Sequence, residues 1–273
     1  MNNVRNITYP LIDAIQIFLE LVNTVCIIKK LVIFIHKLGN EMGEKFFSVI
    51  FYSFYILEGN YLELKRTLES YRKLTQSDEF IFDSKKHIEL HIQGGRELGR
   101  LIHNYAAAWL SLVDHTRAIQ KKLKDHQQEE IRNFAVEYEN KLSESLKESF
   151  ENSFVKDLRR YVQHQAVAVP ALYFRIKQVN FSNSASEPPL SEISHSFELN
   201  TKQIQDFDWS RTSKEYISKN ESIPLEKIIE RHFSLMKDFY LWIQFRDHQL
   251  HPYSSTSVKQ STFEEWKQQQ NSM

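Results

Sequence analysis

The chain has 273 residues, enough for one large domain or two small ones, and its basic and acidic side chains number 35 each. The resulting zero net charge argues against a protein that is basic over its whole surface, as nucleic-acid coats are, but allows a local basic patch. The six glycines and six prolines each make up about 2% of the chain, well below the usual shares of about 7% and 5%. Their scarcity predicts few turns and long helices. The single cysteine, Cys26, excludes an internal disulfide and suits a reducing cytosol, so we expect a cytoplasmic protein.

The first predicted element is an amphipathic helix within the apolar stretch Leu11–His36. A membrane span needs about 20 apolar residues with few charges, whereas Asp13, Glu20 and Asn23 interrupt this stretch. It also has no small-residue cleavage site of the secretory kind. We therefore expect soluble core and no membrane partner in an N-terminal helical region, residues 1–75. A membrane-associated helix is the alternative.

Three long stretches follow with apolar residues at the three- and four-residue steps of a helix. The first is Glu44–Tyr71, and the second runs from about Ser84 to Lys124 after a polar turn. The third, Ile131–Val162, recurs mainly in steps of four, so its apolar stripe drifts around the helix and contacts several partners. We interpret all three stripes as core packing.

After His164 the pattern changes from helix to strand. Alternation over Leu172–Phe181 favours a strand, and Pro170 ends the preceding helix at or before the residue in front of it. A second possible strand is Ile193–Leu199. These two strands are expected to form a small antiparallel hairpin.

The last predicted element is a long helix that opens at Ile223-Pro224 and ends before Pro252. A polar, glutamine-rich tail over residues 254–273 is expected to be partly disordered. The predicted fold class is therefore mainly α, a helical bundle with a small antiparallel β-hairpin inserted before the last long helix. Residues 76–253 are assigned to one helical domain that includes this hairpin.

Several signatures of catalytic chemistry are absent from the sequence. It has no Gly-x-x-x-x-Gly-Lys phosphate loop, no Gly-x-Ser-x-Gly elbow and no kinase signature set. His87 and His91 have the spacing of a zinc pair, but the zincin pattern needs glutamate where Ile88 stands. We interpret both histidines as exposed helix residues, and we expect no metal site and no cofactor.

The segment Phe154–Lys177 is the strongest candidate for function, because its five basic and one acidic side chains leave a net charge of plus four. It contains the string LRRYVQH, in which four residues separate Arg159 from His164. This string resembles the R-x(4–6)-H motif of the HEPN superfamily, helical proteins that include metal-independent ribonucleases, toxins and phage-defence nucleases. The strings HNYAAAWLSLVDHTR (103–117) and FYLWIQ (239–244) are similar to those of a group of uncharacterised bacterial helical proteins. The resemblance covers about residues 84–251.

The resemblance implies a ribonuclease that needs no metal, with Arg159 and His164 as its catalytic residues. Histidine can move a proton near neutral pH, and arginine can bind two phosphate oxygens as negative charge builds on them. An aromatic ring beside them can stack on an unpaired base. The candidate RNA-binding residues of the segment are Arg160, Tyr161, Arg175 and Lys177.

Three features bear on whether Arg159 and His164 act as this motif does: how often the pattern occurs, the residue after the arginine, and helix geometry. The bare pattern occurs three times in the chain, and Arg246 with His251 is a second candidate site. The family usually has a small polar residue after the arginine; here Arg160 stands there, and it either reinforces phosphate binding or displaces an orienting contact. Five residues turn about 500° on an ideal helix, so Arg159 and His164 point roughly 140° apart. The family's solution is a two-fold dimer that joins the pairs across a cleft.

Two functions are therefore predicted. The first is a HEPN-like ribonuclease that cleaves RNA as a homodimer, acts as a toxin or phage-defence effector, and has an antitoxin or other regulatory protein as a further partner. The alternative is a catalytically silent helical interaction or scaffold protein of the same fold. In that alternative Arg159 forms a structural ion pair, for example with Asp157, and His164 caps the end of its helix.

Overall fold

The computed structural model describes residues 44–76, 80, 83–178, 191–250 and 261–271. The chain divides into two compact units, residues 1–51 and 52–273. The predicted helix within Leu11–His36 lies outside the described residues, as does Cys26. No helix in the described part of the chain is long and apolar enough to span a membrane.

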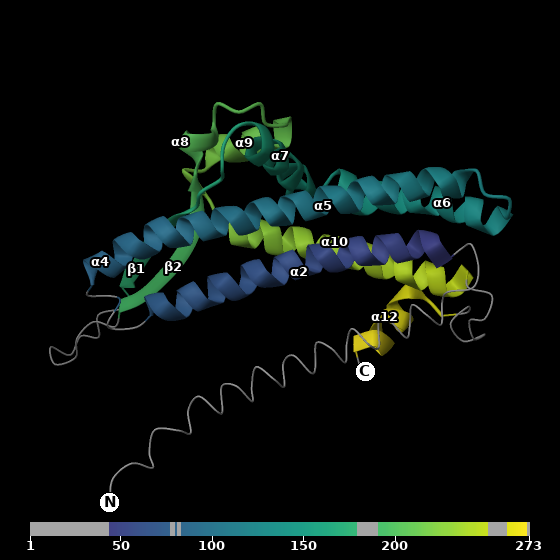
Figure 1. Ribbon diagram of the computed structural model, residues 1–273, viewed down its shortest axis with the longest axis horizontal. Coiled ribbons are helices and arrows are strands. Elements are labelled where there is room, and N and C mark those ends of the chain that lie inside the picture. The colour runs from purple at the N-terminus through teal and green to yellow at the C-terminus, as the bar shows by residue number, and fades with distance from the viewer. Residues whose placement is uncertain (1–43, 77–79, 81–82, 179–190, 251–260, 272–273) are drawn as a thin grey trace, which may run out of the picture. The chain divides into compact units, whose positions relative to one another are not determined.

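The described chain is mainly helical, as the sequence predicts (Figure 1). Its long helices are α2 (Glu44–Thr75), α5 (Gly95–Lys124), α6 (Glu129–Leu142), α7 (Phe150–His164) and α10 (Leu225–Leu250). The shorter helices are α4 (Ser84–Glu89), α8 (Thr201–Ile204), α9 (Arg211–Lys219) and α12 (Phe263–Asn271). Two π-helical turns, η1 (Leu90–Gly94) and η2 (Ser143–Lys147), lie directly before α5 and directly after α6.

The stripe predicted over Ile131–Val162 is confirmed as helical but is divided into two helices. The break follows η2, where Ser149 takes an extended conformation and its hydroxyl accepts a hydrogen bond from the amide of Asn152 at 3.2 Å. A serine in this position caps the first turn of a new helix. As a result α7 begins as a helix separate from α6.

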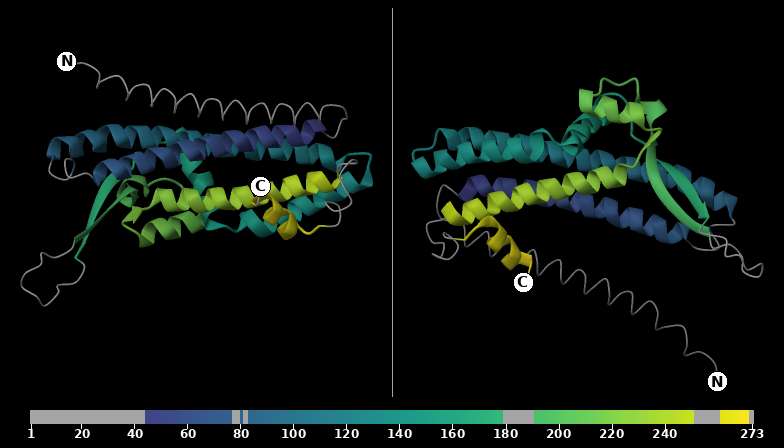
Figure 2. Two further views of the ribbon diagram at one scale, coloured as in Figure 1. Left: turned by 90° about the horizontal axis from the view of Figure 1, so that it is seen from below. Right: turned by 180° about the vertical axis from the view of Figure 1, so that it is seen from behind.

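Within the second unit, aromatic rings join residues 52–75 of α2 to α10, and the two helices lie side by side (Figure 2). The ring centroid of Phe54 on α2 lies 3.8 Å from that of Tyr240 on α10, and Tyr61 lies 3.9 Å from Phe233. The core positions of the predicted stripes are buried as expected, among them Leu57, Leu64, Leu101, Ile102, Leu112, Phe134, Phe154 and Leu158. The interpretation of these stripes as core packing is therefore confirmed.

The predicted hairpin is present and forms part of a three-stranded antiparallel sheet in the order β1-β2-β3. Its strands are β1 (Ala171–Gln178), β2 (Ser191–Asn200) and β3 (Ser222–Ile223). In the register, Ala171 lies opposite Glu198, and Leu199 lies opposite Ile223. No sequence signal marks β3, because two residues are too few to show alternation.

Part of the tail that was expected to be partly disordered is ordered, since α12 forms within it. Trp266 is buried, and its ring lies 5.9 Å from that of Phe245 on α10. Lys267 adds an ion pair with Asp238 at 2.6 Å. One large aromatic side chain thus orders a segment whose average composition is polar.

Glycines at the start of α5 allow an extended segment to cross that helix closely. A Cβ atom added to Gly95 would lie 3.2 Å from the carbonyl oxygen of Pro170, and one added to Gly99 would lie 3.1 Å from that of Ala168. The stretch that joins α7 to β1 therefore crosses α5 where there is no room for a side chain. This crossing places the hairpin beside the N-terminal end of α5 (Figure 1).

We predict that Gly99→Ala and Gly59→Ala will change stability in opposite directions. Both glycines lie inside helices, where alanine is favoured by up to about 1 kcal/mol. A Cβ at Gly59 meets no atom within 4 Å, whereas at Gly99 it presses on backbone, and overpacking costs about 1–3 kcal/mol. Urea unfolding followed by circular dichroism should show Gly59→Ala more stable than the wild type and Gly99→Ala less stable. Equal shifts for the two variants would contradict the close crossing.

Candidate functional site

The helix that carries the motif, α7, is fixed by a buried carboxylate. Asp157 is 2% exposed, and its Oδ2 accepts hydrogen bonds from the Ser210 amide at 2.9 Å and from the Ser213 hydroxyl at 2.7 Å. Ser210 is the residue immediately before α9. Asp157 therefore ties α7 to the start of α9 and is itself well supplied with donors.

Arg160 adds to these contacts of Asp157 and also helps to hold α7 against the segment before α9. Its Nη1 lies 3.5 Å from Asp157 Oδ1 and 3.3 Å from the carbonyl oxygen of Asp208, and its Nη2 lies 3.4 Å from Asp208 Oδ2. Its guanidinium carbon also lies 5.3 Å from the centroid of the Phe207 ring. These contacts are long but numerous, and they direct Arg160 toward the loop before α9.

Tyr161, predicted to contact RNA, packs into the protein. Its ring stacks on Trp209 at 5.8 Å between centroids and meets Phe207 edge-on at 5.4 Å. The residue is 6% exposed, and burial raises the pKa of its hydroxyl. In this conformation the ring has no face free for an unpaired base.

Arg159 is placed quite differently from its neighbour. It is half-buried, its Nε is enclosed without a hydrogen-bond partner, and no ion pair reaches it from the described residues. The alternative in which Asp157 pairs with Arg159 is not the arrangement found, because Asp157 pairs with Arg160. Helix geometry explains this difference, since residues three apart face each other and residues two apart do not.

His164 is the last residue of α7, and its side chain is exposed. The end of the helix is closed by the main chain, because the amides of Gln165 and Ala166 both donate to the carbonyl oxygen of Tyr161, at 2.9 and 3.2 Å. The imidazole of His164 makes no hydrogen bond within the described part of the chain. His164 therefore makes no capping hydrogen bond here, although its place in the last turn of α7 is the one that the structural alternative requires for an interaction with the helix dipole.

The remaining predicted RNA-binding residues lie on the hairpin. Arg175 and Lys177 are two apart in β1, opposite Ser194 and Glu192 of β2. Residues two apart in a strand share one face of the sheet. The register therefore places both basic residues on the same face of the hairpin.

The second candidate motif has a paired arginine. Arg246 on α10 makes an ion pair with Glu137 of α6 at 2.8 Å, and it also donates to the side chain of Gln249. Its partner in the motif, His251, lies outside the described residues. Arg246 thus joins two helices through its terminal nitrogens, although its Nε has no partner.

The histidine pair considered for zinc, His87 and His91, has no third ligand among the described residues. His87 lies 2.6 Å through Nε2 from the carbonyl oxygen of Phe80, and His91 is exposed. Among the residues that the structure describes, no group of three histidine, cysteine, aspartate or glutamate side chains could hold a metal ion.

A buried polar cluster in the core is not among the residues predicted from the sequence. His232 on α10 is fully buried, and its Nδ1 lies 2.7 Å from the hydroxyl of Tyr105 on α5. Its Nε2 and the Nε1 of nearby Trp109 are buried without hydrogen-bond partners, and burial lowers the pKa of His232 to about 3. One sequence signal marks this histidine, because its spacing places it on the apolar stripe of α10 between Ile229 and Met236.

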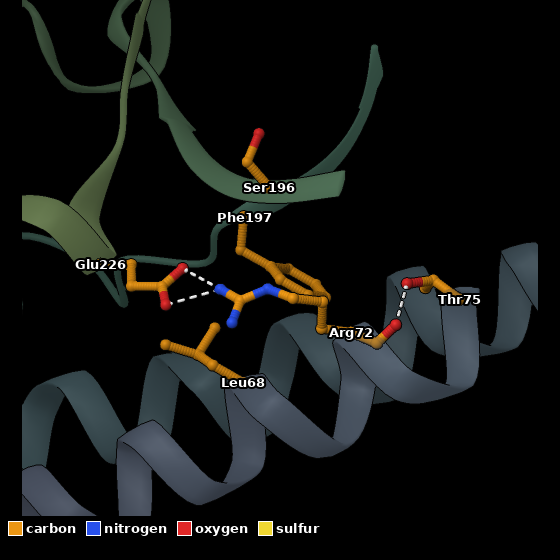
Figure 3. Close-up of a pocket in the computed structure, with 6 residues that line it drawn as sticks. All are labelled: Leu68, Arg72, Thr75, Ser196, Phe197 and Glu226. Carbon is orange, nitrogen blue, oxygen red and sulfur yellow. Dashed lines mark hydrogen bonds and ion pairs between the residues drawn. The ribbon is translucent and has the colours of Figure 1, made fainter. Parts of the chain in front are cut away.

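Two adjoining small cavities lie between α2, α10 and β2, the second of them also lined by α5, and neither is lined by a residue of the motif. The first has Arg72 in its wall, which makes a two-point contact with Glu226 at 2.7 and 2.8 Å (Figure 3). The second is lined mainly by leucine and isoleucine side chains together with Pro170 and Phe197. Each has a volume of about 10 Å³, roughly the space of one water molecule.

Comparison with known proteins gives no match to any family model, to any curated protein or to any solved structure.

We predict that His232 makes the stability fall as the pH is lowered from 7 to 5. Its pKa is about 3 in the folded protein and near 6.5 when unfolded, so the unfolded chain binds the proton first. The free energy of unfolding should fall by up to about 1.4 kcal/mol per pH unit below 6.5. Urea unfolding of the wild type and of His232→Gln at pH 7, 6 and 5 measures this slope.

His232→Gln should lose most of the slope, whereas His91→Gln, at an exposed site, should keep it. The slopes of the free energy of unfolding against pH can be compared even if His232→Gln is less stable than the wild type at every pH. Equal slopes for the wild type and His232→Gln would contradict the assignment.

Proposed function

We propose that this protein is a metal-independent ribonuclease in which Arg159 binds a phosphate of RNA and His164 transfers protons. One observation carries the proposal: the guanidinium of Arg159 is half-buried and has no hydrogen-bond or ion-pair partner among the described residues. Charged groups withdrawn from water are normally paired. An arginine left unpaired in this way is suited to an anion supplied from outside.

The contrast with two other arginines supports this choice. Arg160 is held by Asp157 and Asp208, and Arg246 is held by Glu137. Both have intramolecular partners for their terminal nitrogens. Of these three arginines, only Arg159 has no anionic partner within the described chain, which favours the motif of α7 over the one near the end of α10.

The proposed chemistry needs only the groups of this motif and the substrate. His164 takes the proton of the ribose 2′-hydroxyl, and the 2′-oxygen attacks phosphorus. The bond to the 5′-oxygen breaks, His164 gives the proton it has taken to that oxygen, and a 2′,3′-cyclic phosphate remains. General acid–base catalysis of this kind contributes about 10²–10⁴-fold in rate, and Arg159 stabilises the charge that develops on the phosphate oxygens.

The proposal includes a homodimer with the Phe150–His164 helix in its interface. Arg159 and His164 project about 140° apart on one helix, so a single copy cannot direct both at one phosphate. A two-fold axis near the motif lets the arginine of one copy act with the histidine of the other, as the resemblance to the HEPN superfamily implies. A nuclease of this kind fits a toxin or phage-defence effector restrained by an antitoxin or other regulatory protein.

A catalytically silent interaction protein is the second candidate, and a specific observation favours it. Tyr161 and Arg160, two of the predicted RNA-binding residues, are engaged within the protein. The two cavities described above lie elsewhere and hold about one water molecule each. In this alternative α7 serves as a surface for another protein.

We predict that His164→Ala and Arg159→Ala will separate catalysis from binding. His164→Ala should lower the cleavage rate at least about 100-fold while leaving RNA affinity nearly unchanged, since a neutral histidine adds little charge. Arg159→Ala should lower both the cleavage rate and the RNA affinity. It should also make the slope of log affinity against log salt concentration shallower by about 0.7 for single-stranded RNA. Cleavage of labelled RNA and fluorescence anisotropy across a salt series measure these effects.

Matched controls are His91→Ala and Arg117→Ala, which remove an exposed histidine and an exposed arginine outside the motif. Both should keep wild-type activity, and EDTA should not inhibit the reaction. Loss of activity in Arg246→Ala but not in His164→Ala would transfer the site to the second motif. Wild-type protein that cuts no RNA would support the silent interaction protein instead.

A further inference from the structure

The helix α2 has an apolar face that no other described residue covers. The residues on it follow the three- and four-residue steps of one helix side, and each of its four side chains is between 39% and 55% exposed. This surface, called the α2 face below, consists of Tyr52, Tyr55, Ile56, Gly59 and Leu62. Exposed apolar surface of this extent on one side of a helix is typical of a contact with another protein.

Gly59 lies at the centre of the α2 face and packs against none of the residues that the structure describes. Glycine inside a helix costs about 1 kcal/mol relative to alanine. At Gly95 and Gly99 a close backbone accounts for the missing side chain, but a Cβ at Gly59 would meet no atom within 4 Å. A glycine in the middle of an exposed apolar face is suited to the close approach of a helix from another molecule.

Arg66 continues the same side of α2 beyond Leu62. Its guanidinium is exposed and has no ion pair or hydrogen bond within the described part of the chain. Arg66 lies seven residues after Gly59, and Tyr52 lies seven residues before it. The α2 face therefore has an aromatic end and a cationic end at equal distances from its glycine.

We propose that a second copy of this chain covers the α2 face, with the two α2 helices antiparallel and crossing at Gly59. A two-fold axis at Gly59 brings Tyr52 of one copy to Arg66 of the other, where the cation can lie over the ring. It also brings Ile56, three residues before the axis, to Leu62, three residues after it. The face thus complements itself through two cation–π contacts and through apolar surface, as a symmetric contact requires.

The contact goes beyond the proposed ribonuclease and does not depend on it, because the α2 face contains no residue of the α7 motif. From Tyr52 to Arg66 an α-helix rises about 21 Å. One pair of helices over that length buries less than the roughly 800 Å² per partner of a standard interface. We therefore expect a dimer that dissociates in the micromolar range.

Sedimentation velocity of the full chain from 1 to 200 µM tests the proposal with Gly59→Gln. The wild type should show one association step across this range that depends on the α2 face, whatever contact the α7 helix makes, and Gly59→Gln should raise the dissociation constant of that step at least tenfold. The variant should not melt at a lower temperature, since its side chain enters open space and glutamine favours a helix. Arg66→Gln should weaken the dimer in the same direction, whereas Lys65→Gln, off the face, should leave it unchanged.

A cross-link gives a second measurement. In a Cys26→Ser background, Gly59→Cys lies on the proposed axis and should form a disulfide-linked dimer under mild oxidation, while Lys65→Cys should not. Wild-type protein that stays monomeric to 200 µM would overturn the proposal and leave the face to a different protein. A dimer unaffected by Gly59→Gln would also overturn it, and RNA cleavage by that dimer would leave the ribonuclease proposal intact.

Discussion

Removing a carboxylate from water costs several kcal/mol unless donors replace its hydration, and Asp157 meets that requirement with an amide, a hydroxyl and an arginine. The position of the motif helix depends on this group, because its bonds to Ser210 and Ser213 join α7 to α9. The same carboxylate selects between two adjacent arginines. It pairs with Arg160, three residues along the helix, and leaves Arg159 without an acidic partner in the described chain.

These bonds of Asp157 give Arg160 a structural role, although the superfamily that the motif resembles usually has a small polar residue at this position, and they do not remove the proposed chemistry. A small polar residue at this position would leave Asp157 with only the two donors of the α9 segment. Arg160 adds a third donor and also covers Phe207, whose ring packs against Tyr161. Arg160 thus has a structural role, and within the motif the proposed function depends on Arg159 for its positive charge.

Hydrophobic periodicity predicted most of the fold because it records directly which side of each helix is buried. The boundaries within the stripes were less predictable, since they depend on single residues such as Ser149, whose cap divides α6 from α7. The helix α12 depends on one tryptophan in a polar segment, and β3 is too short to leave a pattern. The cap at Ser149, helix α12 and strand β3 do not show in hydrophobicity averaged over a stretch of sequence.

The site was predictable only in part, for a different physical reason. The string around Arg159 identifies the segment, but the sequence alone does not show which of its side chains are already paired. The rule for residues three apart selects Arg160 as the partner of Asp157, whereas the burial of Tyr161 depends on Phe207 and Trp209, which lie about 50 residues further along the chain. His232 likewise shows its character only once Tyr105 is brought against it.

The zero net charge of the chain has a consequence for the proposed ribonuclease. Affinity for RNA comes largely from neutralised phosphates, and a single copy offers one unpaired motif arginine. Two copies joined about an axis offer two arginines and two histidines to the same strand, so both binding and catalysis then depend on assembly. In that proposal, a partner that separates the copies would silence the enzyme without touching its catalytic residues, which is the form of control that the proposed regulatory protein would exert.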